Sequence, residues 1–411
     1  MTTADTTDLI ESPYAWGRML ASLALMTLGG SGMYAVVVVL PLVQAEFDIA
    51  RGAASLPYTF TMVGFGIGGV LMGRLADRFG VVMPVLLGAV CLGLGFVAAS
   101  LATSPWQFAL AHGVMIGLLG CAATFAPLVA DISLWFTRRR GIAVAITISG
   151  NYVAGAIWPP VLQAFFDGYG WRATYAATGL FCLVAMLPLA MVLRRPPPLS
   201  ELPAATTGPA RNVDFRRPLG LSPLALQNVL CVSGVACCVA MAMPQVHIVA
   251  YCGDLGFAAA RGAEMLSLML GFGVLSRLAS GWISDRIGGL RTLLLGATLQ
   301  ALALAFFLPA DGLVSLYVVS GLFGMFQGGI VPSYAMIVRE HFSPREAGQR
   351  VGTVLMATLF GMALGGWMSG AIFDVTGSYQ AAFFNGIGWN LVTIAIALEL
   401  IRRSRRDLVP A

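Results

Sequence analysis

Apolar residues occur in long runs along the chain, and each run is followed by a short polar or charged connection. A membrane-spanning helix needs about 20 consecutive, mostly apolar residues. Twelve segments meet this requirement: 18–43, 53–74, 82–102, 105–131, 141–166, 171–193, 224–251, 261–284, 291–309, 312–338, 347–373 and 379–401. The pattern predicts an all-α membrane protein with twelve transmembrane helices.

One long polar stretch, residues 194–223, interrupts this series after the sixth segment. It is rich in proline and arginine and too polar to span a bilayer, so we expect a linker between two halves. The predicted organisation is a cytoplasmic N-terminus, an N-terminal six-helix bundle, the linker, a C-terminal six-helix bundle and a cytoplasmic C-terminus. These parts cover residues 1–17, 18–193, 194–223, 224–401 and 402–411.

The composition supports a membrane class, because 58% of the residues are hydrophobic and only 10% are charged. Soluble domains carry roughly 25% charged residues. All 24 basic residues are arginines, so the excess positive charge reflects membrane topology and predicts no nucleic-acid partner. The seven cysteines show no metal-binding spacing, and we expect them to pack within apolar segments. No cleavage site follows the N-terminus, which predicts a retained first span.

The arginines are distributed unevenly between the two sets of connections. With the N-terminus inside, 20 arginines fall in cytoplasmic segments, whereas the outer segments hold three: Arg51, Arg172 and Arg261. Cytoplasmic loops of membrane proteins carry an excess of positive residues. We therefore expect a multi-pass protein of the bacterial inner membrane with both termini cytoplasmic.

The two halves of the chain repeat one another. Residues 73–80 return as residues 281–288 with an offset of 208, and residues 166–170 return as 373–377 with an offset of 207. Gly141, after a run of three arginines, corresponds to Gly348 in a second basic loop. The constant offset predicts duplicated bundles of equal orientation, related by a pseudo-two-fold axis along the membrane normal.

Arg277 lies deep within an apolar segment and marks a candidate anion site. An arginine keeps its charge, and a charge at the bilayer centre costs at least about 2.5 kcal/mol, so such a residue usually faces a partner or a cavity. The position 208 residues earlier is Gly69, so this charge has no counterpart in the first half. Because there is one such cation, the site fits a single carboxylate.

Other polar residues in the spans could line the same cavity. His247 precedes Arg277 by 30 residues and is a candidate for substrate binding or proton coupling, with a structural histidine as the alternative. Further candidates for substrate contact are Tyr34, Asn151 and Gln327, although helix packing uses the same residue types.

The remaining titratable residues are better explained by structure. We expect His112 to be a structural histidine and His341 to be solvated in a basic loop. Asp131 lies beside the loop of three arginines, where we expect it to form an ion pair, and Glu399 should form a surface pair beside Arg402.

The sequence of residues 73–80, Gly-Arg-Leu-Ala-Asp-Arg-Phe-Gly, resembles the signature loop of the major facilitator superfamily. The resemblance covers essentially the whole chain and implies a transporter that works by alternating access. It also implies that the loop residues and their copies form cytoplasmic gating contacts. These residues are Gly73, Asp77, Arg78, Asp285 and Arg286.

A narrower resemblance is to the monocarboxylate transporters and their bacterial relatives, including oxalate:formate antiporters. Residues 135–143 are similar to the W-F-x-x-R-R-G-x-A loop of that family, with Arg138, Arg139 and Arg140 at its basic positions. Residues 169–172 open the sixth span in the same way. The family anchors its carboxylate with an arginine in the eighth span, and Arg277 matches that position.

The chain also departs from these relatives. Mammalian members carry an acidic residue one turn before the arginine, where this chain has Gly273, and oxalate:formate antiporters carry a second cation in the eleventh span, which is absent here. Many bacterial members have Tyr-x-Pro in the fourth span, where Phe125 stands in this sequence. The loss of that hydroxyl favours a more apolar monocarboxylate as substrate.

The sequence therefore predicts a monomeric, proton-coupled symporter of small monocarboxylates, such as a lactate-like or pyruvate-like acid. Its partners would be the substrate, a proton and the lipid bilayer. We expect no cofactor, no metal and no enzymatic activity, since motifs such as H-E-x-x-H and G-x-S-x-G are absent. The alternatives are a carboxylate exchanger and a membrane solute sensor that does not transport.

Overall fold

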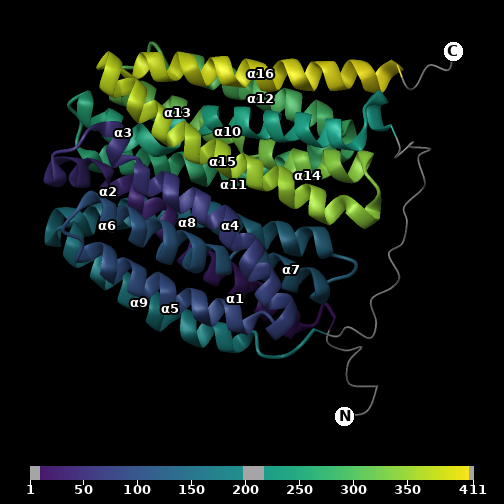
Figure 1. Ribbon diagram of the computed structural model, residues 1–411, viewed down its shortest axis with the longest axis horizontal. Helices are drawn as coiled ribbons and strands as arrows, with labels where there is room; N and C mark the ends of the chain where they lie inside the picture. Colours follow the sequence, from purple (N-terminus) through teal and green to yellow (C-terminus); the bar gives the residue numbers. More distant parts are fainter. Residues whose placement is uncertain (1–9, 198–216, 407–411) are drawn as a thin grey trace. The chain divides into compact units, whose positions relative to one another are not determined.

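The computed structural model describes residues 10–197 and 217–406, and nearly all of them are helical (Figure 1). Within this part of the chain, twelve helical stretches are long and apolar enough to cross a membrane. They are Pro13–Phe47, Arg51–Phe79, Val82–Ser100, Pro105–Trp135, Arg140–Tyr169, Trp171–Val192, Pro223–Asp254, Ala259–Ile287, Gly289–Phe307, Leu313–His341, Glu346–Thr376 and Tyr379–Ser404. The predicted all-α class with twelve spans is confirmed, and most helices extend a few residues past the predicted limits.

Several of these stretches consist of more than one helical element. The elements used below are α1 (Pro13–Gly29), α2 (Ser31–Phe47), α3 (Arg51–Ala54), α4 (Leu56–Phe79), α5 (Val82–Ser100), α6 (Pro105–Leu110), the π-helix η3 (Ala111–Cys121), α7 (Ala126–Trp135), α8 (Arg140–Tyr169), α9 (Trp171–Val192), η5 (Pro218–Gly220), α10 (Pro223–Asp254), α11 (Ala259–Ile287), α12 (Gly289–Phe307), α13 (Leu313–Gln327), α14 (Ile330–His341), α15 (Pro344–Thr376) and α16 (Tyr379–Arg406).

Parts of three predicted segments lie outside the described residues. These are residues 1–9 of the N-terminus, residues 198–216 of the linker with Arg211 and Arg216, and residues 407–411 of the C-terminus.

The chain divides into two compact units. Unit 1 comprises Met1–Asp48 and Leu56–Gly208, and unit 2 comprises Ile49–Ser55 and Pro209–Ala411. The short helix α3 therefore belongs to unit 2, although it connects α2 to α4 of unit 1.

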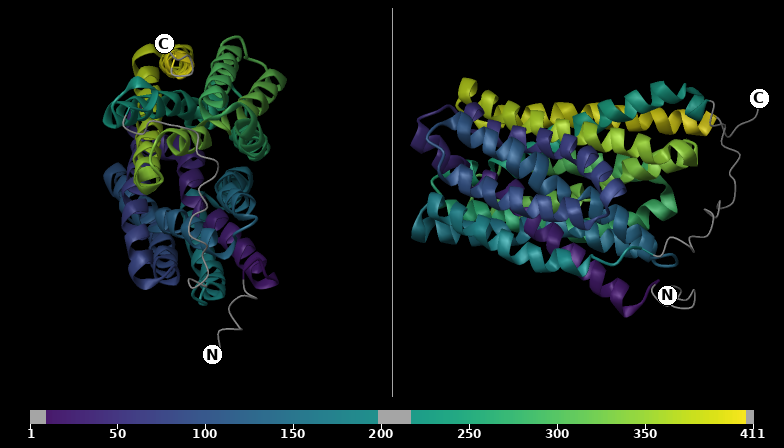
Figure 2. Two further views of the ribbon diagram at one scale, coloured as in Figure 1. Left: turned by 90° about the vertical axis from the view of Figure 1, so that its right-hand side faces the viewer. Right: turned by 60° about the horizontal axis from the view of Figure 1, so that its bottom comes forward.

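Glycines allow the helices within each unit to approach closely. In unit 1, a Cβ added to Gly64 or Gly68 of α4 would lie 2.2 Å or 2.0 Å from backbone oxygens of η3. In unit 2, a Cβ on Gly361 or Gly365 of α15 would lie 2.5 Å from backbone oxygens of α10. Small residues at helix contacts are the usual device for packing in a bilayer. Figure 2 shows the resulting parallel helices from two further directions.

Positive backbone φ angles recur at equivalent positions of the two halves. Gly80 and Gly288, which are 208 residues apart, have φ values of 79° and 83°. Gly170 and Gly377, which are 207 residues apart, have values of 78° and 67°. L-residues with a side chain rarely adopt this region, so the repeated glycines preserve the same tight turns.

Candidate functional site

Two helix junctions meet inside unit 1. One junction is Gly30, between α1 and α2, and the other lies between η3 and α7 at Thr124 and Phe125. The two approach so closely that a Cβ on Gly29 would lie 1.9 Å from Oγ1 of Thr124. Interrupted helices are the usual location of substrate sites in transporters.

A small cavity of about 10 Å³ lies at these junctions. It is lined by Met26, Gly30, Met33, Phe65, Cys121, Thr124, Phe125 and Asn151. The structure thus brings together Phe125 and Asn151, two of the predicted substrate residues. The third from this unit, Tyr34, is buried on α2 but does not line the cavity. The volume suffices for about one water molecule.

Unit 2 contains a corresponding junction between α13 and α14, at Gly328 and Gly329. Gln327, the last residue of α13, is fully buried, and its Oε1 accepts a hydrogen bond of 2.8 Å from Nε2 of Gln245. Its own Nε2 group has no hydrogen-bond partner within the described residues. A buried, unsatisfied N–H donor is costly, and a carboxylate could accept its hydrogen bond.

Arg277 is half-buried on α11, close to this junction. A Cβ on Gly328 would lie 2.5 Å from the carbonyl oxygen of Gly273 and 2.8 Å from Cβ of Ser276. Arg277 directly follows Ser276 in the chain, and Gln327 directly precedes Gly328. The structure therefore places the predicted anchor arginine on the part of α11 that packs against the break in the tenth span.

His247 is fully buried on α10, and both of its ring nitrogens are engaged. Nε2 lies 2.8 Å from the carbonyl oxygen of Gly366, and Nδ1 lies 2.9 Å from the hydroxyl of Tyr379. In this state the ring offers no nitrogen to a substrate carboxylate. Its position within a polar network is compatible with a role in proton coupling.

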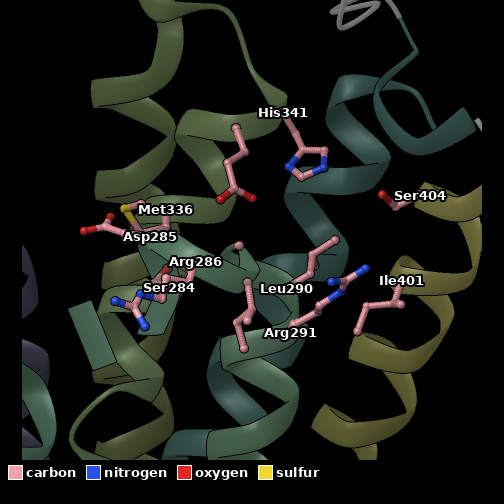
Figure 3. A pocket seen from close by; sticks show the side chains of 12 residues that line it. Ser284, Asp285, Arg286, Leu290, Arg291, Met336, His341, Ile401 and Ser404 are labelled. Atoms are coloured by element: carbon pink, nitrogen blue, oxygen red, sulfur yellow. The ribbon is translucent and has the colours of Figure 1, made fainter. Parts of the chain in front are cut away.

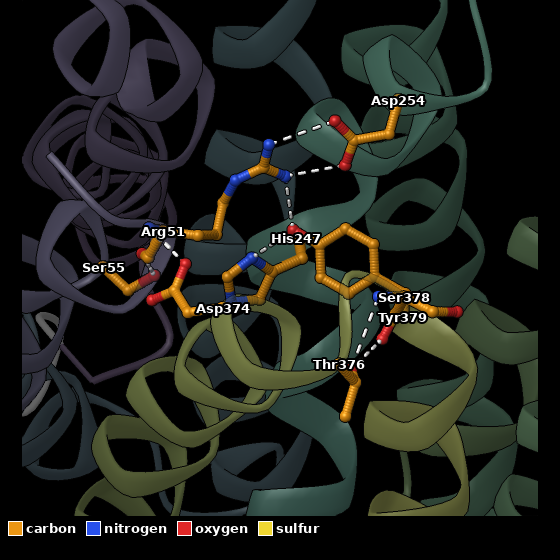
Figure 4. A network of polar contacts seen from close by, with 8 residues as sticks. All are labelled: Arg51, Ser55, His247, Asp254, Asp374, Thr376, Ser378 and Tyr379. Carbon is orange, nitrogen blue, oxygen red and sulfur yellow. Dashed lines mark hydrogen bonds and ion pairs between the residues drawn. The ribbon is translucent and has the colours of Figure 1, made fainter. Parts of the chain in front are cut away.

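That network includes residues that the sequence did not single out (Figure 4). The guanidinium of Arg51 forms an ion pair of 2.8 Å with Asp254 and also donates a 2.8 Å hydrogen bond to the hydroxyl of Tyr379. The carboxylate of Asp374 accepts backbone N–H groups of α3. The distribution of charges along the chain predicted Arg51 only as one of three arginines on the outer side, whereas the repeat of the two halves contains a clue to its partner.

The predicted gating residues of the two halves lie at helix ends. Gly73, Asp77 and Arg78 belong to the end of α4, and Asp285 and Arg286 belong to the end of α11. Among the described residues, neither aspartate forms an ion pair within its own unit. The gating role therefore stays a prediction.

A pocket of about 460 Å³ surrounds the second of these helix ends (Figure 3). Asp285 and Arg286 line it together with Arg291, Glu340 and His341. Arg286 stacks on the ring of Trp282 at 3.6 Å, and Glu340 accepts the backbone N–H of Gly289. His341 is partly exposed on this pocket, and its Nδ1 lies 3.0 Å from the carbonyl oxygen of Ile337.

The ion pair expected for Asp131 is present, but its partner is Arg18 and not one of the arginines at 138–140. Asp131 instead forms two 2.8 Å hydrogen bonds with Arg18, whose guanidinium also stacks on Trp135. Arg140 donates to the carbonyl oxygen of Ser133. Because Arg18 on α1 already supplies Asp131 with a buried counter-charge, its carboxylate forms no ion pair with the exposed arginine loop.

The loop before α8 has a different acidic partner, Glu11. The carboxylate of Glu11 accepts the backbone N–H of Arg139 at 2.8 Å and that of Thr137 at 3.3 Å, beside Arg138. These bonds, the one from Arg139 above all, hold the pKa of Glu11 below its ordinary value.

Two further expectations concern single residues. Glu399 pairs with Arg403 at 2.8 Å and not with Arg402, because residues four apart share one face of a helix. His112 is fully buried between Thr61 and Tyr175, which agrees with the structural role expected for it.

Comparison with known proteins identifies the family to which this chain belongs. The chain matches the Major Facilitator Superfamily over residues 20–319 and 254–410. It is 31% identical to monocarboxylate transporter 13 of Rattus norvegicus over 340 residues, which cover 80% of this chain and 74% of the relative. The protein of the same name from Bos taurus is 30% identical over 315 residues, or 75% and 71% of the two chains.

A solved structure shares the fold along almost the whole chain. It is a bacterial homolog of the human lysosomal transporter Spinster, in an inward-facing and occupied conformation. The TM-score is 0.72 at 15% identity, with 96% of this chain and 97% of that chain covered.

Proposed function

Because the chain belongs to the major facilitator superfamily and is therefore a membrane transporter, we propose that it carries small monocarboxylates in symport with protons. The observation that supports this substrate class is Arg277, an arginine within a membrane-spanning helix beside the break in the tenth span. The similarity of the chain to proteins named monocarboxylate transporters supports the same class of substrate.

A single carboxylate fits the polar groups of unit 2. Arg277 supplies the positive charge, and the Nε2 group of Gln327 supplies a buried donor that lacks a partner among the described residues. Both groups donate hydrogen bonds, which a carboxylate oxygen accepts. A dicarboxylate would bring a second negative charge without a second cation, and a buried uncompensated charge is costly.

The cavity of unit 1 is lined mainly by apolar side chains, among them Phe65, Phe125 and two methionines, together with the polar side chains of Asn151 and Thr124. The rings of Phe65 and Phe125 meet edge to face, with centroids 5.5 Å apart. Phe125 brings no hydroxyl to this cavity, which supports a substrate with an apolar body.

We assign the proton to His247, a buried imidazole in a polar network. We also propose that the protein is a monomer of the bacterial inner membrane with cytoplasmic termini, as the distribution of arginines predicts.

Uptake by purified protein in proteoliposomes tests the substrate class. We expect an inward proton gradient to drive uptake of radiolabelled pyruvate or lactate, and Arg277→Ala to abolish it. Arg261→Ala is the matched control, because Arg261 lies on the same helix but is half-exposed and pairs with Glu264. Undiminished uptake by Arg277→Ala, with Arg261→Ala equally active, would remove Arg277 from the site.

The same vesicles separate symport from exchange. A symporter accumulates substrate only while the proton gradient lasts, whereas an exchanger shows counterflow of labelled against unlabelled acid without one. Counterflow of equal rate at every imposed gradient, with no net accumulation, would replace symport by exchange.

A further inference from the structure

The internal repeat of the chain reveals a missing cation in unit 2. In unit 1, Arg172 at the start of α9 pairs with Glu46 at the end of α2, at 2.6 Å. Asp254 follows Glu46 by 208 residues, and Tyr379 follows Arg172 by 207. Unit 2 has therefore kept the carboxylate but has a tyrosine where the partner arginine stands in unit 1.

A second pair has changed in the same region. In unit 1, the carboxylate of Asp167 accepts a 2.8 Å hydrogen bond from Nε2 of Gln163. The positions 207 residues later are Asp374 and Gly370. Unit 2 has again kept the carboxylate, here Asp374, but has lost the side chain that donates a hydrogen bond to it.

Helix α3 supplies both missing partners. The guanidinium of Arg51 binds the two oxygens of Asp254 at 2.8 Å and 3.1 Å. The backbone N–H groups of Arg51 and Gly52 each donate to Asp374 at 2.7 Å. Arg51 is 8% exposed and stacks on the ring of Phe373 at 4.5 Å. Two-oxygen contacts of arginine with a carboxylate are among the strongest polar contacts in proteins.

The close contact between α3 and α15 requires a glycine on each helix, Gly52 on α3 and Gly370 on α15. A Cβ on Gly370 would lie 2.9 Å from the carbonyl oxygen of Arg51 and 2.9 Å from Oγ of Ser55. A Cβ on Gly52 would lie 3.0 Å from Asp374 and 3.2 Å from the backbone nitrogen of Ala371. The glutamine found at the equivalent position of unit 1 would occupy this space.

We propose that α3 is a detachable latch of the transport cycle. The segment Ile49–Ser55, which contains α3, is bonded covalently to Asp48 and Leu56 of unit 1 but is held by side chains of unit 2. A transporter that moves one half against the other must release such a link in some states and restore it in others. This role rests on the proposed transport function; with the proposed orientation, the latch lies on the outer side.

His247 controls the latch through Tyr379. The carbonyl oxygen of Gly366 can only accept, so Nε2 of His247 carries the proton and Nδ1 is the acceptor. The hydroxyl of Tyr379 therefore donates to Nδ1 and accepts from Arg51. This arrangement requires a neutral imidazole.

Protonation of His247 would disrupt it, because Nδ1 would become a donor and the hydroxyl of Tyr379 would lose the acceptor to which it donates. The charged and titratable groups of the network around the ring are Arg51, Asp254, Asp374 and Tyr379. On the neighbouring helix α11, Arg261 and Glu264 pair with each other. A second positive charge beside Arg51 weakens its hold, so acid should release the latch.

Cysteine accessibility tests the latch without any substrate. Ser55 is fully buried next to α3, and Ser55→Cys is nearly isosteric. Its rate of reaction with a water-soluble maleimide reports release of the segment in purified full-length protein in nanodiscs. The parent protein gives the background of native cysteines, and Thr103→Cys, on an exposed loop, corrects for the pH dependence of the reagent.

Two variants in the Ser55→Cys background should release the latch. Arg51→Ala removes its guanidinium, and the double variant Gly370→Gln with Tyr379→Arg rebuilds the self-sufficient arrangement of unit 1. We expect labelling to rise about ten-fold in both, as for a segment that opens locally while the fold persists. Thermal unfolding and gel filtration establish that each variant is folded. The matched control, Arg172→Ala, breaks the equivalent pair of unit 1 and should not change labelling.

The histidine step has its own variant. Labelling of the parent latch should rise as the pH falls and the imidazole of His247 takes up a proton. Tyr379→Phe removes the hydroxyl between ring and guanidinium and should reduce this dependence, because only the charge of the imidazolium would then act on Arg51. Slow, pH-independent labelling of every folded variant would overturn the latch. Because no carboxylate is present, that result would leave the proposed substrate untouched, and failed uptake would leave the latch untouched.

Discussion

Arg18 and Asp131 are 113 positions apart, yet two hydrogen bonds of 2.8 Å join the guanidinium to both carboxylate oxygens. The Arg18 side chain is fully buried, and that of Asp131 is 6% exposed. The guanidinium also donates to the hydroxyl of Tyr14 and the carbonyl oxygen of Arg195. The pair therefore connects α1 and α7 to the segment that follows α9.

Removing one member of this pair should destabilise unit 1 strongly. Asp131→Ala leaves a buried guanidinium without its counter-charge, and such a loss costs about 3–5 kcal/mol. We expect a marked fall in the thermal unfolding temperature of the purified protein. Glu399→Ala, which breaks the exposed pair with Arg403, is the control and should change little. Equal unfolding temperatures for the two variants would contradict the structural role of Arg18.

Helix packing in unit 2 provides a second prediction. A Cβ on Gly365 would lie 2.5 Å from the backbone oxygen of Val239, and a backbone atom cannot be moved cheaply. Gly365→Ala should therefore separate α15 from α10 and lower the yield of folded protein. Gly352 is the matched control on the same helix, because nothing lies within 4 Å of its missing Cβ. Gly352→Ala should be neutral or slightly stabilising, by up to about 1 kcal/mol from helix propensity. A folded Gly365→Ala protein with unchanged unfolding temperature would show that the helices can move apart freely.

The membrane spans were predictable because each depends on a local run of apolar residues. The repeated glycine turns were visible as sequence motifs that occur once in each half. Contacts such as Arg18–Asp131 and Arg51–Asp254 were not. They join residues 113 and 203 positions apart, and no local periodicity indicates which distant helix a side chain will meet. The pairing of Glu399 with Arg402 failed for a simpler reason, since helical spacing favours Arg403.

In the candidate site, too, local sequence predicts some features, whereas others depend on how distant helices pack. Arg277 stood out because a charge in an apolar run is costly wherever the helix lies. The hydrogen bond between Gln245 and Gln327 depends on how two helices pack, and the sequence does not specify that geometry. The clue to Arg51 was comparative: Tyr379 occupies the place of an arginine in the other half, so a carboxylate lacked its partner.

The contact between Glu11 and the loop before α8 should depend on pH. Glu11 has a pKa below its ordinary value because backbone N–H groups, first that of Arg139, bond to its carboxylate. A lowered pKa in the folded state means that this contact stabilises the protein above the ordinary pKa of glutamate. That contribution is lost as the pH falls through the lower, folded-state value. Glu11→Gln should therefore unfold at a slightly lower temperature than the parent at neutral pH, and the two should converge in acid. A difference that persists unchanged in acid would indicate that the charge of Glu11 is irrelevant.

Gln327 provides the sharpest test of the proposed carboxylate site. Its Nε2 group is buried and has no partner among the described residues, while its Oε1 is held by Gln245. If that donor binds the substrate, Gln327→Leu removes one hydrogen bond to a charged group, which is worth about 1.5–3 kcal/mol. We expect the KM for pyruvate uptake to rise by about ten-fold or more, with a smaller change in kcat. Gln300→Leu is the control, because Gln300 is equally buried in unit 2 but donates to the backbone oxygen of Cys237. That variant should lower the unfolding temperature without raising the KM. If Gln327→Leu also left the KM unchanged, the substrate would bind without the tenth span, and Arg277 would need a different second donor.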